Sequence, residues 1–116
     1  MREIKFRAFY NGKMYKVENW MFKVGMNWVI VEDEKVEKIP AESIMQYTNL
    51  KDKNDKEIYE SDVVANQYGY KFEIVFKDGC WFAGDTEVGF MSKDKYKIIG
   101  NIYENPELLG ENKWNN

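Results

Sequence analysis

The sequence contains no histidine and only one cysteine, Cys80. Histidine is the side chain that titrates near neutral pH, the commonest general base and a favoured ligand of transition metals. A single cysteine cannot form a disulfide within the chain, nor a zinc site that needs several thiolates. We therefore expect a non-enzymatic protein from a reducing compartment, with no cofactor and no tightly bound transition metal.

Long apolar segments are missing as well. The longest apolar run, residues 28–31, is far shorter than the ~20 residues that a membrane-spanning helix requires. The first residues, MREIKF, contain no apolar stretch like that of a signal peptide. These two absences predict a protein that makes no contact with a membrane and stays in the cytoplasm.

The composition that remains is typical of a soluble globular protein. Of the 116 residues, 44% are hydrophobic, 16% are aromatic and 32% are charged. A chain of this length can bury roughly two thirds of the surface that it exposes when unfolded, which is enough for one core. We expect a single domain over residues 1–110 and a loosely ordered tail over residues 111–116.

The beginning of the chain has the pattern of a β-hairpin. Polar and apolar residues alternate over residues 3–8, which is typical of a half-buried strand. Asn11 and Gly12 follow, and this dipeptide favours a tight hairpin because both central residues of a type I′ turn need positive φ. Residues 14–27 do not indicate where their strands begin or end.

Further strands are expected before the middle of the chain. Residues 28–31 and residues 36–39 have strand-like apolar patterns, and the acidic residues between them indicate a turn. Residues 41–47 fit either one helical turn or a short strand, and propensity does not decide between the two.

The second half of the chain repeats the alternation of short strands and turns. Residues 62–68 and 71–76 are predicted as strands that join through Gly69. Asp78 and Gly79 form the second strong turn dipeptide, which should reverse the chain. The strands expected after it cover residues 80–83, 88–91 and 96–103.

Near the end, the residues have the order expected of a short helix. Asn105 stands at the N-cap position, Pro106 at the first helical position, and Gly110 after the last turn. The expected fold is therefore mainly β, a small barrel-like or sandwich domain of short antiparallel strands with one short C-terminal helix.

Three blocks of sequence carry a family resemblance. They are MREIKFRAF at the start, IMQYTNLKDKNDKEIYESDVV in the centre and IIGNIYENPELL near the end. Together, in this order, they resemble the YopX family of small phage and prophage proteins. The resemblance implies a mostly β fold, an origin in a phage or prophage of a bacterial host, and no assigned biochemical activity. It supplies no catalytic residues.

The chain departs from the family pattern at Asn49, Asp55 and Ser61, where the family leads us to expect glycine. Glycine at these positions would indicate positive φ or a tight turn, and asparagine and aspartate tolerate that conformation best in its absence. We expect Asn54 and Asp55 to form a turn. Serine accepts positive φ less easily, so the resemblance alone leaves the conformation at residue 61 open.

The charged stretch of residues 46–62 is therefore interpreted as a turn between two segments that are anchored in the core. The charges of residues 51–57 should lie in water because burying them would be costly. The residues expected to be buried are Tyr47, Leu50, Ile58, Tyr59 and Val63. Those expected to be exposed are Lys51, Lys53, Asn54, Asp55 and Lys56.

Other polar residues do not assemble into a known site. Glu57, Glu60 and Asp62 could supply oxygen ligands to a hard cation, but their spacing matches no calcium loop. Asp62 is expected to accept hydrogen bonds from nearby backbone N–H groups instead. Cys80 has no histidine to activate it and is interpreted as a core residue.

The first 23 residues carry most of the positive charge that could contact a partner. They contain six lysine or arginine residues against two glutamates, interleaved with aromatic residues. Aromatic and basic side chains together suit single-stranded nucleic acid, although a small β domain also needs aromatic residues for its core. The candidate contacts are Lys5, Arg7, Lys13, Lys16 and Lys23.

The sequence therefore leads to two hypotheses about function. The first is a small phage or prophage accessory protein that binds a protein partner without catalysis. The alternative is binding of single-stranded nucleic acid through residues 1–23. Formation of a homo-oligomer stays open.

Overall fold

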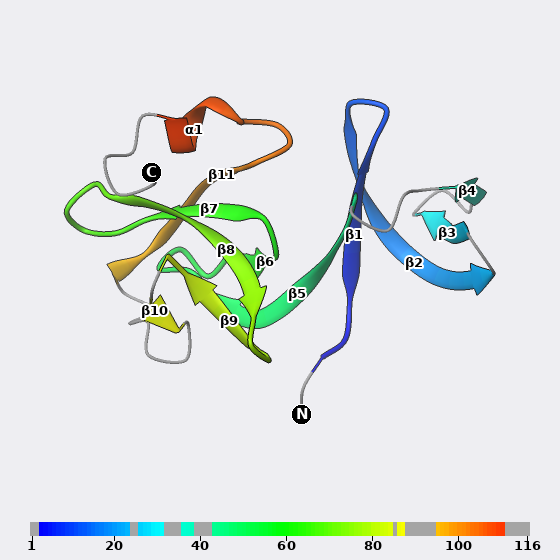
Figure 1. Cartoon of the computed structure of the whole chain (residues 1–116), viewed down its shortest axis with the longest axis horizontal. Coiled ribbons are helices and arrows are strands. Elements are labelled where there is room, and N and C mark those ends of the chain that lie inside the picture. Colours follow the sequence, from blue (N-terminus) through cyan, green and yellow to red (C-terminus); the bar gives the residue numbers. More distant parts are fainter. Residues whose placement is uncertain are drawn as a thin grey trace. The chain divides into compact units, whose positions relative to one another are not determined.

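The computed structural model describes residues 3–23, 26–31, 36–38, 43–84, 86–87 and 95–110 (Figure 1). For the strand residues from 18 to 38 and for residues 86–87, only the backbone is described. The chain divides into two compact units, Met1–Tyr47 and Thr48–Asn116, and each is described by itself.

The described residues are mainly β and contain one short helix. The strands are β1 (Phe6–Tyr10), β2 (Lys13–Lys23), β3 (Met26–Val31), β4 (Val36–Lys38), β5 (Ile44–Lys51), β6 (Glu57–Tyr59), β7 (Asp62–Ala65), β8 (Lys71–Lys77), β9 (Cys80–Ala83), β10 (Thr86–Glu87) and β11 (Lys97–Asn101), and the helix is α1 (Glu107–Gly110). The sheets have the strand orders β4-β3-β2-β1-β5-β6 and β10-β9-β8-β7-β11. The expected fold class is confirmed, with short antiparallel strands and a short C-terminal helix.

The first unit is built on the hairpin of β1 and β2. Asn11 and Gly12 lie at its tip with φ of 51° and 76°, the left-handed values that a type I′ turn needs. Ala8 on β1 and Ile44 on β5 are buried together, which gives this unit a small apolar cluster. The partly buried side chains packed against it are Phe6, Tyr10, Tyr15 and Val17.

The residues that had no clear pattern, 14–27, lie largely in β2 and β3. These two strands pair antiparallel, with Trp20 opposite Val29 and Phe22 opposite Asn27. The acidic turn expected after residue 31 lies outside the described residues. Residues 44–47, for which helix and strand were both open, belong to strand β5, where Ile44 pairs with Ala8 of β1.

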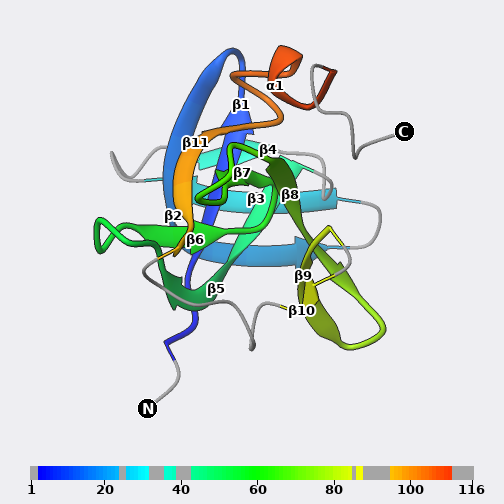
Figure 2. The ribbon, with the colours of Figure 1, turned by 90° about the vertical axis from the view of Figure 1, so that its left-hand side faces the viewer.

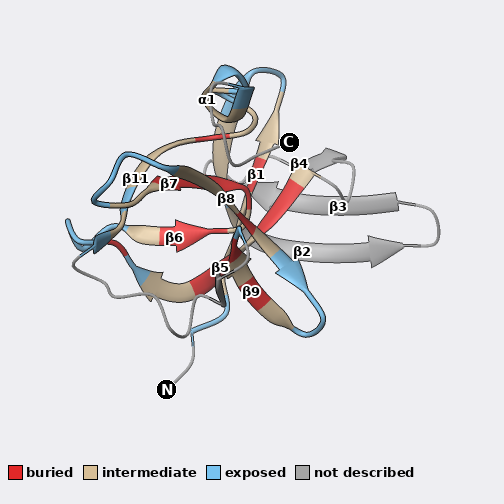
Figure 3. Cartoon of the chain, turned by 60° about the vertical axis from the view of Figure 1, so that its left-hand side comes forward, coloured by how far each residue is buried: buried red, intermediate tan, exposed pale blue. Residues whose placement is uncertain are grey.

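The second unit has its own apolar core. Its fully enclosed members include Ile58, Val64 and Ile74, each no more than 1% exposed, from three different strands (Figure 3). Trp81 and Ala83 of β9 complete the buried cluster. Leu50, expected to be buried, is only half-buried and packs against the edge of this cluster.

Two strands in this unit are shorter than expected because side chains bond to the backbone at their ends. β7 ends at Ala65, since the side-chain oxygen of Asn66 accepts hydrogen bonds from the N–H groups of Tyr68 and Tyr70 at 2.9 and 3.1 Å. β11 ends at Asn101, whose side-chain oxygen accepts bonds from two following N–H groups. Such local bonds compete with strand pairing and start a turn. The strand expected at residues 88–91 lies outside the described part.

The helix lies where the sequence predicts it, but the side chain of Asn105 does not have the predicted N-cap role. The Leu108 N–H donates to the main-chain oxygen of Asn105 at 3.1 Å. The Asn105 side chain does not cap α1, since its oxygen accepts a bond from the Asn101 N–H at 3.3 Å instead. With four residues, α1 is far too short to cross a membrane, and no other helix in the described ranges could do so.

Replacing Gly100 by alanine should lower the free energy of unfolding by about 1–3 kcal/mol, because it overpacks the contact between β11 and α1. A Cβ at residue 100 would lie 2.8 Å from Leu108 Cδ1 and closer still to the Asn105 side chain. Gly110→Ala is the control, since a Cβ there meets nothing within 4 Å. Urea unfolding of both variants is the measurement, and equal midpoints would contradict the prediction.

Candidate functional site

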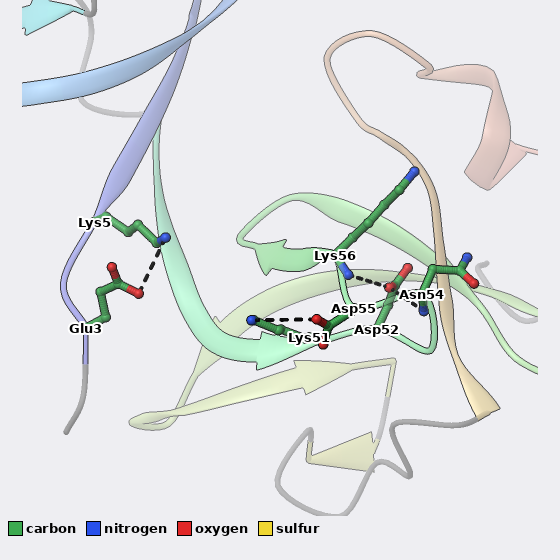
Figure 4. Close-up of polar contacts among 7 residues, drawn as sticks. All are labelled: Glu3, Lys5, Lys51, Asp52, Asn54, Asp55 and Lys56. Atoms are coloured by element: carbon green, nitrogen blue, oxygen red, sulfur yellow. Dashed lines mark hydrogen bonds and ion pairs between the residues drawn. The ribbon is translucent and has the colours of Figure 1, made fainter.

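The charged segment between β5 and β6 is organised by one buried carboxylate. Asp52 is 0% exposed, and its Oδ1 accepts hydrogen bonds from the N–H groups of Asn54 and Lys56, both at 2.9 Å (Figure 4). Its Oδ2 accepts a third bond from the N–H of Ile98, also at 2.9 Å. The expectation that all charges of residues 51–57 lie in water was therefore wrong for Asp52, because three backbone donors replace its water.

The environment of Asp52 keeps it ionised. Burial by itself disfavours the charged form and raises the pKa, but the backbone N–H groups of Ile98, Lys56 and Asn54 act in the opposite direction. Together with the charge of Lys56 they hold the pKa below its ordinary value. A carboxylate with these bonds serves the fold, and it is poorly placed to act as an acid, a base or a metal ligand.

Apart from the half-buried Leu50, the other residues with an expected burial follow the expectation. Tyr47, Ile58 and Val63 are buried, and Tyr59 is 9% exposed. The exposed positions are Lys51, Lys53, Asn54, Asp55 and Lys56. Lys51 Nζ lies 4.0 Å from the Asp55 carboxylate, an ion pair that is too exposed to contribute much to stability.

Asp62 is also a structural carboxylate. It is 2% exposed, and its Oδ2 accepts a 2.7 Å hydrogen bond from the Tyr59 N–H, which confirms the expected role of bonding to nearby backbone. In the part of the chain that the structure describes, no three His, Cys, Asp or Glu side chains group closely enough to hold a metal ion.

The pKa of Glu73, on β8, is raised, first by burial and then by the negative charge of Glu60. A carboxyl group with a raised pKa could act as a general acid. Of the other reactive groups, Cys80 is half-buried on the paired strand β9, and Asp52 accepts hydrogen bonds from backbone N–H groups.

The three positions where the family leads us to expect glycine all have positive φ. The values are 68° at Asn49, 66° at Asp55 and 71° at Ser61. The turn expected at Asn54 and Asp55 is present, and the serine adopts the same left-handed conformation as the other two. The backbone therefore has the shape that glycine would favour, although the side chains differ.

Asp55→Gly should leave stability unchanged or raise it by up to about 1 kcal/mol, because relief of the left-handed strain offsets the added entropy of the unfolded chain. Asn54→Gly is the matched control, since Asn54 is not among the residues with positive φ. It should lose about 0.4–1 kcal/mol. Urea unfolding gives both values, and a larger loss for Asp55→Gly than for Asn54→Gly would refute the strain argument.

The basic residues proposed to contact nucleic acid do not lie on one face. In the pairing of β1 with β2, Arg7 stands opposite Lys16, and Tyr10 stands opposite Lys13. Since alternate residues of a strand point to opposite faces, Arg7 and Lys16 share one face and Lys13 lies on the other. Lys23 pairs with Met26 at the far end of β2.

Two of these lysines are already engaged within the first unit. Lys5 Nζ lies 3.4 Å from the Glu3 carboxylate (Figure 4). It also lies 4.9 Å from the centre of the Tyr47 ring. Lys13 Nζ lies 5.1 Å from the centre of the Tyr15 ring. Lys13 and Lys16 are nevertheless exposed, whereas Lys5 and Arg7 are half-buried.

The hairpin of β8 and β9 carries an apolar surface that the sequence reasoning did not single out. Asp78 and Gly79 form its tip with φ of 52° and 79° (Figure 2). Just before the tip, Phe76 is 55% exposed and stands opposite Trp81, edge to face, with ring centres 4.9 Å apart. The sequence pattern that could have indicated this surface is the alternation of apolar residues at Phe72, Ile74 and Phe76, which continues one apolar residue beyond the buried core.

Phe76 thus extends the apolar face of the core to the surface. Ile74, two residues earlier on the same face, is 0% exposed and stands opposite the buried Ala83. On the other face of the hairpin, Lys77 Nζ lies 4.9 Å from the centre of the Phe82 ring. We call the exposed Phe76 side chain, together with the buried Trp81 ring beside it, the hairpin surface.

Comparison with known proteins agrees with the resemblance noted in the sequence. The family model described as YopX protein matches residues 5–110. Among solved structures, the chain is similar to the crystal structure of protein EF1440 from Enterococcus faecalis, with 29% sequence identity and a TM-score of 0.69. That alignment covers 91% of this chain and 97% of the other. No curated protein is similar enough to match.

Proposed function

This chain belongs to the YopX family, and from that premise we propose that it is a non-enzymatic accessory protein of a phage or prophage that binds a protein partner in the bacterial cytoplasm. The observation that carries the proposal is the hairpin surface. Phe76 leaves more than half of an aromatic side chain in water, beside a second aromatic ring. Aromatic side chains are enriched at the centres of protein interfaces, where they supply much of the binding energy.

The absence of catalysis is supported by how the polar side chains are used. The two carboxylates that are buried in the described part of the chain, Asp52 and Asp62, accept hydrogen bonds from local backbone N–H groups. The sequence also contains no histidine to act as a base. Binding of a protein partner through the hairpin surface therefore needs no catalytic reaction.

Binding of single-stranded nucleic acid through residues 1–23 is the second candidate. It is favoured by the exposure of Lys13 and Lys16 and by the position of Arg7 opposite Lys16. The engagement of Lys5 with Glu3 and Tyr47 weakens it, because those contacts would compete with a phosphate.

A photoreactive amino acid placed at residue 76 tests the protein-partner proposal. In a nuclease-treated lysate of the host, it should cross-link one protein that the same amino acid at residue 56, on the exposed turn, does not. With that protein purified, Phe76→Ser should weaken binding by about tenfold or more, and Lys56→Ser should have no effect.

Two outcomes would change the conclusion. If the cross-linked protein is a second copy of this chain, the hairpin surface mediates a homo-oligomer. If the purified protein binds Phe76→Ser as tightly as the unchanged chain, the proposed surface is wrong.

A further inference from the structure

Three lysines from two segments of the second unit, the turn after β5 and the start of β11, line one pocket of about 330 Å³. The residues that line it are Lys53, Ala65, Asn66, Gln67, Gly69, Lys95 and Lys97. Among these described lining residues there is no aspartate or glutamate. We call this the lysine pocket.

The backbone ties the two lysine-bearing segments together and to strand β7. The Lys53 N–H donates to the main-chain oxygen of Tyr96 at 2.9 Å, which ties the turn after β5 to the start of β11 between Lys95 and Lys97. Lys97 in turn pairs with Ala65 at the end of β7. The pocket is therefore assembled by fixed backbone, although the lysine side chains themselves are long and solvated.

No ion pair to a carboxylate is found for these lysines among the described residues. Lys53, Lys95 and Lys97 are all exposed, and within the described ranges none of them makes an ion pair or a ring contact. Like charges gathered at one site repel one another and attract anions. Asn66 adds a donor, since its side-chain oxygen is occupied by two backbone N–H groups and its amide nitrogen is left for a ligand.

An exposed aromatic residue belongs to the loop that lines the pocket. Tyr68 lies between the lining residues Gln67 and Gly69 and is 76% exposed. A tyrosine in this position offers a flat face on which a base can stack, and stacking beside a basic groove is how many proteins bind single strands. The volume also exceeds what one phosphate group needs and is in the range of small ligand sites.

We propose that the lysine pocket binds a backbone phosphate of single-stranded nucleic acid while Tyr68 stacks on a neighbouring base. The pocket is lined by none of residues 1–23 and by neither residue of the hairpin surface. It does not depend on the protein-partner proposal.

Fluorescence anisotropy with labelled oligo(dT) and oligo(U) of about twelve nucleotides tests the proposal, since single-strand sites span roughly this length. Affinity should fall with salt, with a log-log slope of about −0.7 for each phosphate neutralised. Replacement of Lys53, Lys95 or Lys97 by glutamine should weaken binding several-fold and reduce the slope by up to about 0.7. Tyr68→Ala should weaken binding by about 5- to 100-fold, and Tyr68→Phe should not.

The controls separate this pocket from other basic surfaces. Lys56→Gln changes an exposed lysine of the same turn that does not line the pocket, and Lys13→Gln with Lys16→Gln changes the N-terminal candidates. Lys56→Gln and Phe76→Ser should leave affinity and slope unchanged, and the double N-terminal variant measures what residues 1–23 contribute by themselves. Unchanged thermal unfolding midpoints for the pocket variants would show that any loss of binding is not a loss of folding.

Several results would overturn the proposal. One is that neither oligonucleotide binds at low salt. Another is that affinity falls when Lys13 and Lys16 are replaced but not when the pocket lysines are. A third is that a duplex binds as tightly as the single strands and that Tyr68→Ala does not change its affinity. Titration with uridine monophosphate, followed by ³¹P NMR, tests whether the pocket binds the phosphate of a free nucleotide. Binding of the nucleotide without binding of the strands would mean that the pocket takes a free nucleotide instead.

Discussion

Asp52→Asn is expected to lower the free energy of unfolding by about 2–4 kcal/mol, because hydrogen bonds to a buried charge are strong and an unpaired buried donor is costly. One carboxylate oxygen serves Asn54 and Lys56, and the other serves Ile98. An amide has only one oxygen, so in either orientation its NH₂ group faces a backbone donor. Urea unfolding at neutral pH gives the difference directly.

The control for this change is Asp55→Asn, which removes an exposed carboxylate three residues further along the same turn. It should alter stability by no more than about 0.5 kcal/mol. If both substitutions lower the free energy of unfolding by the same amount, the hydrogen bonds of Asp52 to the backbone do not stabilise this turn.

The Asp52 bonds should also make stability depend on pH. The pKa of Asp52 is lower in the folded chain than the value of about 3.9 for unfolded aspartate, so the folded state favours the ionised form. The resulting stability is complete well above pH 4 and is lost as the pH falls through the folded pKa. The cost of Asp52→Asn should therefore shrink when urea unfolding is repeated at progressively lower pH, and a cost that grows would reverse the assigned sign.

Tyr59→Ala is expected to destabilise the protein by about 3–5 kcal/mol, by analogy with other deletions of large buried aromatic side chains. Tyr59 lies at the end of β6 and is 9% exposed, so alanine would leave a cavity that the surrounding strands fill only in part. Lys53→Ala, on the exposed turn of the same segment, should cost no more than about 0.5 kcal/mol. The same urea experiment measures both.

If Tyr59→Ala left the free energy of unfolding unchanged and Lys53→Ala lowered it, the charged side chains rather than the tyrosines would be what this segment serves to position. In that case the lysine would have to take part in the fold itself. The expected order shows instead that the tyrosine anchors the segment and leaves Lys53 free to contact a ligand.

Features that depend on neighbouring residues could be predicted from the sequence. The turns at Asn11-Gly12 and Asp78-Gly79 depend only on which residues accept positive φ, and the structure has that conformation at all four. The ends of β7 and β11 were placed too late, because Asn66 and Asn101 bond to backbone groups two to four residues away. Strand propensity does not include such bonds.

Features that depend on distant residues could not be predicted. Nothing near Asp52 in the sequence indicates the N–H of Ile98, so its charge was assigned to the surface. The lysine pocket was missed for the same reason. Basic residues were grouped by their closeness along the chain, whereas Lys53 and Lys97 meet only because a turn and a strand lie side by side.

The bond between Asp52 and Ile98 joins residues 46 positions apart in the chain. Closing so long a loop has an entropic cost that local contacts cannot repay, so during folding the turn should reach its final form only after β11 has docked. The Ile98 amide should then exchange its hydrogen with solvent only in openings that also detach β11, with a protection close to that of the core amides. The turn between β5 and β6, although exposed on its outer side, would in this way share the kinetic stability of the sheet to which it is bonded.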